Sequence, residues 1–350
     1  MRNGLRKAAR WAVLVALSAL LVGGLELLRL PAALLLGSLA AAAALTFFDV
    51  EVRVPRRLFY VAQAIVGCLI ARVIVPSTLS EMARGWPTFI GGVLSVIAVS
   101  VALGWLLTRL RVLPGSTAVW GAFPGAATVM TLMAEGFGAD VRLVALMQYL
   151  RVVMVAVAAT AVARFWTVAT PAAAAAVVWF PPVSWTSVAA TTTLAAVSAA
   201  AGRILRFPAG PMLVAMGAGA LLQNFGVLKI ELPLWLLAPA YLLVGWSIGA
   251  RFNRPILAHA ARVLPAVAAS IACLIAACGA LGVALAHFAH VDGLTAYLAT
   301  SPGGADSVAI IAASTKVDMP FIMAMQVARL LIVLFTGPAI ARFIATRARR

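Results

Sequence analysis

Twelve apolar segments, separated by short polar stretches, make up most of this 350-residue chain. They cover residues 11–28, 31–47, 58–76, 88–108, 113–138 and 141–166, and then 184–202, 208–226, 234–250, 265–286, 293–315 and 319–341. Most have the length of about 17–25 residues that an α-helix needs to cross a bilayer. Hydrophobic residues make up 64% of the chain and charged ones 11%, so a water-soluble fold could not cover its surface with polar groups. The sequence therefore predicts an all-helical integral membrane protein.

The chain also repeats itself internally. Pro124 and Pro302 are 178 positions apart, and the same offset joins many other identical residues. Examples are Pro55 with Pro233, Val66 with Val244, Arg84 with Arg262, Asp140 with Asp318, Gln148 with Gln326 and Arg151 with Arg329. Shared hydrophobicity alone does not align prolines, arginines and a glutamine in register. We therefore predict a duplication, with residues 1–166 as the first membrane repeat, 167–183 as a linker and 184–350 as the second repeat.

The fifth segment of each half, 113–138 and 293–315, contains several prolines and glycines and cannot be one continuous helix. Each broken segment either crosses the membrane as a kinked helix or turns back as a re-entrant hairpin. Cytoplasmic loops carry the excess of basic residues. Two hairpins place 19 basic residues inside and 5 outside, whereas two crossings place 15 inside and 9 outside. We therefore predict ten transmembrane helices plus two re-entrant segments, an inverted repeat, and both termini in the cytoplasm.

Inverted repeats with broken segments at matching positions are typical of secondary transporters, whose substrate binds where the breaks meet. The free backbone N–H groups and half-helix N-termini at such breaks suit an anion or a carboxylate. The candidate substrate-binding residues at the two tips are Pro124, Gly125 and Thr128, and Ser301, Pro302, Gly303, Gly304 and Ser307. The hydroxyl groups among them could instead bond back to the preceding helical turn.

Asp306 stands in the second tip at the position where the first tip has Thr128. A carboxylate inside a membrane can bind a proton or Na⁺, so Asp306 is the candidate ion-coupling residue. The alternative is that Asp306 only caps the half-helix that begins after the glycines.

Two further candidates lie in the segment that follows each tip. Gln148 and Arg151, like Gln326 and Arg329, are three residues apart, so each pair presents an amide and a guanidinium on one helix face. Both arginines lie about ten residues into an apolar segment, and a buried charge needs a partner. That partner is either a substrate carboxylate, or the backbone carbonyls of the hairpin in a structural clamp.

Other classes of site find little support. His287 and His290 stand near Asp292, but a metal site would need further histidine or thiolate ligands, so we expect no metal and no cofactor. The cysteines Cys68, Cys273 and Cys278 lie in apolar stretches, and we expect them to be reduced and buried. No cytoplasmic segment is long enough for a DNA-binding domain, so the expected partners are the lipid bilayer and a small-molecule or ion substrate, not nucleic acid. The sequence is compatible with a homodimer.

Several longer stretches are distinctive: RLPAALLLG, LPGSTAVWGAFPGAA, GADVRLVALMQYLRV, WFPPVS, TAYLATSPGGADSVAIIAA, MAMQ and LFTGPAIARFI. In these stretches the chain resembles the AbrB family of bacterial inner-membrane proteins, which has a duplicated membrane domain. The resemblance covers nearly the whole chain and implies a location in the bacterial inner membrane. The family also carries an ammonia monooxygenase label and a role in regulating gene expression. Copper oxidation chemistry needs a histidine cluster, and the chain has three histidines, so we expect no enzyme.

Two functional hypotheses follow. The first is a secondary transporter for a small anionic organic solute, coupled to H⁺ or Na⁺, in which the hairpin-bearing bundle moves relative to a scaffold. The second is a membrane sensor or regulator that binds a similar ligand and affects gene expression indirectly. The chain has no sizeable cytoplasmic output domain, which favours transport.

Overall fold

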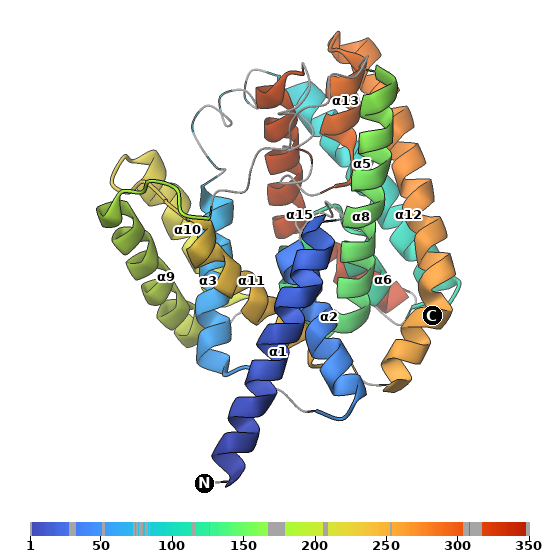
Figure 1. Ribbon diagram of the computed structural model, residues 1–350. Coiled ribbons are helices and arrows are strands. Elements are labelled where there is room, and N and C mark those ends of the chain that lie inside the picture. The colour runs from blue at the N-terminus through green and yellow to red at the C-terminus, as the bar shows by residue number, and fades with distance from the viewer. Residues whose placement is uncertain are drawn as a thin grey trace. The chain divides into compact units, whose positions relative to one another are not determined.

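The computed structural model describes residues 2–27, 33–50, 53–72, 74, 76, 80, 83, 85–113, 116–125, 127–166, 179–205, 209–252, 254–303, 308 and 317–347. All regular secondary structure within these ranges is helical (Figure 1). The main helices are α1 (Arg2–Leu27), α2 (Ala33–Phe47), α3 (Arg56–Ala71), α5 (Trp86–Arg109), α6 (Thr117–Ala122), α7 (Ala127–Gly136), α8 (Val141–Trp166), α9 (Trp185–Leu205), α10 (Gly210–Asn224), α11 (Leu234–Gly249), α12 (Arg254–Ala289), α13 (Gly293–Thr300) and α15 (Met319–Arg347).

Each expected apolar segment overlaps a helix; the first broken segment contains the two short helices α6 and α7, and the described part of the second contains α13. The largest difference is α12, which begins at Arg254, eleven residues before the predicted start at Pro265. Pro265 lies inside α12, where the helix tolerates the loss of one hydrogen bond.

Six helices are long and apolar enough to cross a membrane: α1, α5, α8, α9, α12 and α15. Two shorter apolar helices, α2 and α11, have 15 and 16 residues. Large hydrophobic side chains are exposed on several of these helices, as expected for a lipid-facing surface. The structure therefore agrees with a multi-pass membrane protein, whereas the exact number of crossings stays a prediction.

The chain forms two compact units, each made from two separate stretches. Unit 1 consists of Met1–Val75 and Ala175–His259, and unit 2 consists of Pro76–Ala174 and Ala260–Arg350. Each unit thus takes one part of the first predicted repeat and one part of the second. The boundaries of the sequence repeats stay a prediction.

In unit 1, α3 packs against α9, α10 and α11, while α2 packs against α1 and α11 (Figure 1). Glycines allow two of these helix pairs to approach closely. A Cβ atom at Gly67 of α3 would lie 2.2 Å from the carbonyl oxygen of Met212 in α10. A Cβ atom at Gly245 of α11 would lie 2.8 Å from the carbonyl oxygen of Leu35 in α2. The two contacts match at the offset of the sequence repeat, within one residue.

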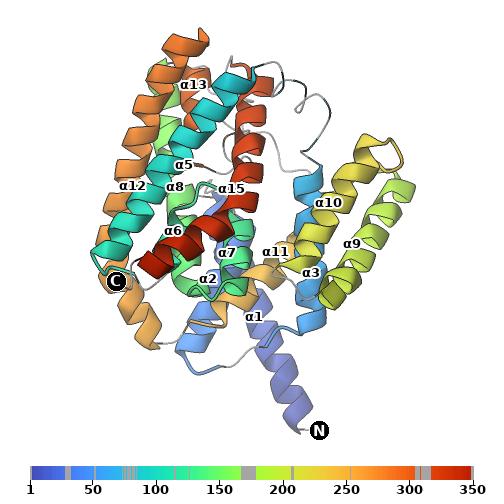
Figure 2. The same cartoon turned by 180° about the vertical axis from the view of Figure 1, so that it is seen from behind.

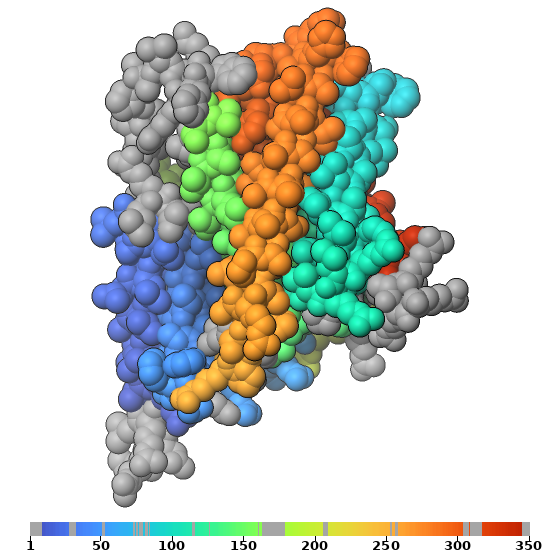
Figure 3. All heavy atoms as spheres, turned by 90° about the vertical axis from the view of Figure 1, so that its right-hand side faces the viewer, coloured from blue at the N-terminus to red at the C-terminus, as the bar shows by residue number. Residues whose placement is uncertain are grey.

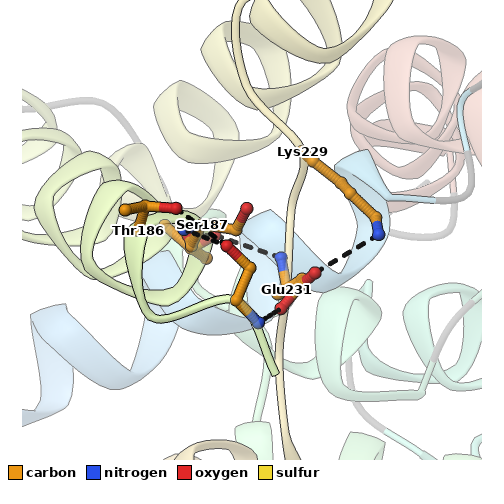
Figure 4. A network of polar contacts seen from close by, with 6 residues as sticks. Thr186, Ser187, Lys229 and Glu231 are labelled. Carbon is orange, nitrogen blue, oxygen red and sulfur yellow. Dashed lines mark hydrogen bonds and ion pairs between the residues drawn. The ribbon is translucent and has the colours of Figure 1, made fainter. Parts of the chain in front are cut away.

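The start of α9 in unit 1 is held by a small polar network (Figure 4). The Glu231 carboxylate accepts a hydrogen bond from the backbone N–H of Ser184 at 2.9 Å and pairs with Lys229 at 3.3 Å. The backbone N–H of Glu231 donates to Thr191 Oγ1 in α9 at 3.2 Å. This network joins the start of α9 to the segment between α10 and α11. Its lysine is largely exposed, so the ion pair itself contributes little stability.

In unit 2, α12 packs against α5 and α8, and α15 packs against α5, α6 and α13 (Figure 2). The space-filling view in Figure 3 shows the long α12 at the surface beside α5. Cys68 and Cys278 are buried free thiols, as expected, but Cys273 is exposed. The expectation for Cys273 was wrong because this residue lies on the outward side of α12.

Candidate functional site

The first broken segment forms a helical hairpin. Its first helix, α6, ends at Ala122, and the next residue, Phe123, has extended backbone with φ −56° and ψ 128°. Pro124 follows, and a residue before proline is driven from helical to extended backbone. After the break, α7 runs back, and the backbone N–H of Asp140 donates to Thr117 Oγ1 at 3.1 Å. The end of the segment therefore returns to its beginning, which distinguishes a hairpin from a kinked continuous helix.

The second broken segment ends its first helix in the same way. Ser301 follows α13 with φ −52° and ψ 131°, directly before Pro302. The backbone N–H of Asp318 donates to Thr295 Oγ1 at 3.1 Å, so this segment also returns to its starting level. Both hairpin bases match at an offset of 178 residues.

A glutamine and an arginine of α8 hold the first tip. Gln148 Nε2 donates to the carbonyl oxygens of Trp120 at 2.8 Å and of Phe123 at 3.1 Å. Arg151 Nη1 donates to the Phe123 carbonyl at 2.6 Å, and its Nη2 donates to the Gly125 carbonyl at 3.1 Å. Arg151 Nη2 also donates to Gln148 Oε1 at 2.6 Å. Together the two side chains tie α8 to the end of α6 and to the break.

The matching glutamine and arginine of α15 hold the second tip. Gln326 Nε2 donates to the carbonyl oxygens of Leu298 at 3.0 Å and of Ser301 at 3.4 Å. Arg329 Nη1 donates to the Ser301 carbonyl at 2.6 Å, and its Nη2 donates to the Gly303 carbonyl at 2.7 Å. Arg329 Nη2 also donates to Gln326 Oε1. We call the two sets the first and the second Gln–Arg clamp.

The clamps explain how two arginines can be buried in apolar helices. Only 1% of Arg151 and 3% of Arg329 is exposed. Each guanidinium sits at the carboxyl end of a half-helix, where unpaired carbonyls and the helix dipole favour a positive charge. In each arginine, Nη2 donates twice and Nη1 once, so the forked end is occupied by the tip and the glutamine. A substrate carboxylate could bind bidentately at that end only by displacing the tip carbonyls.

Of the other predicted tip residues, Pro124, Pro302 and Thr128 are buried. The Thr128 hydroxyl lies beside the hydroxyl of Tyr149 in α8. The remaining candidates, Gly304, Asp306 and Ser307, lie outside the residues that the structure describes. The alternative of hydroxyls that bond back into their own helix holds for two neighbours of the tips: Thr131 donates to the Ala127 carbonyl, and Thr300 to the Ala296 carbonyl.

Sequence reasoning missed three features of this region. The hairpin bases depend on Thr117 and Thr295, which the 178-residue offset could have revealed. A ladder of rings along the first hairpin joins Phe137, Trp120 and Phe123, with centroids 5.5 and 5.7 Å apart. The Arg342 guanidinium lies 5.0 Å from the Phe137 ring centre. The ladder has no periodic signature in the sequence because tertiary packing brings its members together.

Two carboxylates at the hairpin bases have structural partners. Burial alone would raise the pKa of Asp140, but hydrogen bonds and the charge of Arg142, with the N–H of Leu143, hold this pKa below its usual value. Burial would likewise raise the pKa of Asp292, but hydrogen bonds from Thr295 and Leu294 outweigh the effect of burial and leave this pKa lowered. Asp292 accepts from the backbone N–H groups of these two residues and so caps α13. Asp292, the acid near His287 and His290, therefore has a structural role as the N-cap of α13.

Long apolar helices and two clamped hairpins define the class of protein, a multi-pass helical membrane protein. Within that class the chain belongs to the AbrB family. The family model described as "Transition state regulatory protein AbrB" matches residues 34–345. A relative from Escherichia coli (strain K12), named "Putative regulator AbrB", is 48% identical over 340 residues, which are 97% of each chain. The "Uncharacterized protein YhjN" of Bacillus subtilis (strain 168) is 26% identical over 308 residues, 83% of this chain and 79% of its own.

Proposed function

We propose that this protein is a secondary transporter of a small anionic organic solute, coupled to H⁺ or Na⁺, and not an enzyme. Its proposed location is the bacterial inner membrane, with both termini in the cytoplasm. The observation that carries the proposal is the pair of broken hairpins in unit 2, each held at its tip by the same Gln–Arg clamp. Broken helices at corresponding positions of two repeats are the typical place of a transporter's binding site.

Contacts that recur at the repeat offset support the proposed duplication. In unit 2 a Cβ atom at Gly104 of α5 would lie 3.0 Å from Val119 Cα of α6. The matching Gly282 of α12 has the same relation to Tyr297 of α13, with a distance of 3.1 Å. Elements of one half also pack against elements of the other, since α13 contacts α8 and α6 contacts α15. Such reciprocal pairing is expected when two homologous halves assemble around a pseudo-two-fold axis.

In this proposal the two tips bind the substrate. Thr128 and Ser301 supply hydroxyls, and the Gln–Arg clamps keep both breaks in place. Asp306, the acid in the tip sequences, exchanges the coupling ion. Transport proceeds by movement of unit 2, which bears the hairpins, relative to unit 1.

The second candidate is a membrane sensor or regulator that affects gene expression indirectly. It is favoured by the name of the Escherichia coli relative, which calls that protein a regulator. A sensor of this kind would bind a ligand at the same tips without moving it across the membrane.

Uptake into liposomes distinguishes the two candidates. Metabolites that accumulate or disappear in a deletion strain would supply the solutes, and purified protein would be tested with each under a proton or sodium gradient. Gradient-driven flux would support transport, and Asp306→Asn should remove its dependence on the ion while the protein still inserts. Ligand binding without any flux would favour the sensor. Wild-type ion dependence in Asp306→Asn would leave this residue with a capping role.

A further inference from the structure

Several buried polar side-chain atoms in the described part of unit 2 have no hydrogen-bond partner. They are Trp120 Nε1, Arg151 Nε, Ser301 Oγ and Arg329 Nε. All four can donate a hydrogen, and the three nitrogens can only donate. The corresponding atoms in the described part of unit 1 are Gln63 Oε1 and Asn224 Oδ1, which can only accept. The described part of unit 2 therefore has more buried donors than acceptors, and buried polar groups in native proteins rarely stay unpaired.

The charges of unit 2, like its unpaired donors, indicate an anionic ligand. Arg329 binds the Gly303 carbonyl, and a Cβ atom at Gly303 would lie 3.0 Å from Val155 Cγ1, one helical turn after Arg151 in α8. The two positive charges therefore belong to neighbouring parts of unit 2. The described acidic residues of unit 2 are Glu135, Asp140, Asp292 and Asp318. None of these four is fully buried, and all lie at hairpin ends. Within the described part of the unit, the two guanidinium charges therefore have no buried acid to balance them, although such charges are normally paired.

Three of the free donors belong to the clamps. Ser301 carries both the free Oγ and the carbonyl that Arg329 Nη1 binds, so this hydroxyl lies next to the second clamp. Because the forked end of each guanidinium is occupied, the free Nε–H groups are left for a ligand. One oxygen of a carboxylate can accept hydrogen bonds from such separate donors. A bidentate pair between a carboxylate and Nη1 and Nη2 is excluded, because both of these nitrogens already donate to other groups.

We propose that the clamps of unit 2 border a site for a small carboxylate, which accepts a hydrogen bond from Ser301 Oγ and is held by the charges of Arg151 and Arg329. This inference rests on the proposed transport function and specifies the class of its substrate. It also changes the role of the arginines: they position the tips through Nη1 and Nη2, and attract the ligand through charge and Nε.

The packing around the second tip limits the size of the ligand. A Cβ atom at Gly303 would lie 3.0 Å from Val155 Cγ1 in α8 and 3.4 Å from Val308 Cγ2. The tip backbone is thus already in contact with the facing helix. A ligand of a few non-hydrogen atoms fits this setting better than a large one.

The test is equilibrium binding to the full-length protein in detergent. Sodium acetate, lactate and pyruvate are the probes, and their neutral analogues acetamide and lactamide are the controls, with sodium chloride added to equal ionic strength. A ligand that binds only the folded protein raises its melting temperature in a saturable manner. We expect at least one carboxylate to do so and the amides to have no effect.

The Ser301→Ala variant should weaken carboxylate binding about tenfold, the effect of losing one hydrogen bond to a charged group. Ser100→Ala is the matched control, because Ser100 is equally buried in α5 but donates to the Val96 carbonyl of its own helix. If Ser301→Ala does not fold, Ser301→Cys keeps the size of the side chain and replaces the hydroxyl by a weak donor.

Three results would overturn the proposal: no saturable shift with any of the carboxylates, equal shifts with carboxylates and chloride, or wild-type affinity in the Ser301 variants. Carboxylate binding without flux in liposomes would leave the site in place and instead overturn the transport function.

Discussion

Replacing Arg329 by lysine tests whether the second Gln–Arg clamp holds the hairpin tip. Lysine keeps the positive charge but presents a single ammonium in place of the planar fork. Arg329 donates to two tip carbonyls, those of Ser301 at 2.6 Å and Gly303 at 2.7 Å. The shorter lysine side chain cannot donate to both in the same geometry. At least one carbonyl is therefore left without its charged partner.

The expected cost follows from the burial of the tip. Losing the partner of one buried carbonyl costs about 1–3 kcal/mol. If the tip opens locally, this cost lowers the free energy of opening by the same amount. Because 1.4 kcal/mol corresponds to a factor of ten, amide exchange at the tip should rise about 5- to 150-fold.

Hydrogen–deuterium exchange measures this effect directly. In Arg329→Lys, peptides that cover residues 296–303 should exchange faster, while peptides that cover 118–125 report on the first clamp and should not change. Arg151→Lys should give the opposite pattern. Unchanged exchange at the second tip, or equal acceleration at both tips, would refute the assignment of one clamp to each hairpin.

Three further predictions concern packing, pH and topology. Gly104→Ala should lower the melting temperature, because the added methyl group overpacks the contact of α5 with α6 at a cost of about 1–3 kcal/mol. Gly91→Ala in the same helix is the control and should not lower it, because nothing lies within 4 Å of its added Cβ. Equal effects of the two variants would contradict the close approach of α5 and α6. The lowered pKa of Asp140 means that its contribution to stability is complete above about pH 3.9 and is lost as the pH falls through the lowered value. Asp140→Asn should therefore flatten the acid side of a melting-temperature profile, and an unchanged profile would count against this pairing. In a cysteine-free background, Gly138→Cys should be labelled from the cytoplasm and His290→Cys from the outside, because these exposed positions lie at the two hairpin bases. Labelling of both cysteines from the same side of the membrane would exclude an inverted repeat.

Much of the local structure is readable in the sequence. Apolar segments of membrane-spanning length predicted the helices, because in a bilayer the backbone must satisfy its own hydrogen bonds. The breaks after α6 and α13 were predicted from Pro124 and Pro302, since proline acts on the residue before it whatever the surroundings. The spacing of Gln148 and Arg151 also predicted that both side chains share one helix face. These features depend on chemistry within a few residues.

The partners of those side chains depend on tertiary structure. The sequence left open whether Arg151 and Arg329 bind a substrate or the hairpin, and the structure places their forked ends on the tip carbonyls. It also divides the chain into two units that each combine stretches from both halves, which no local pattern can specify. Side-chain periodicity determines which face of a helix is polar, but which distant backbone that face meets is decided only when the helices pack.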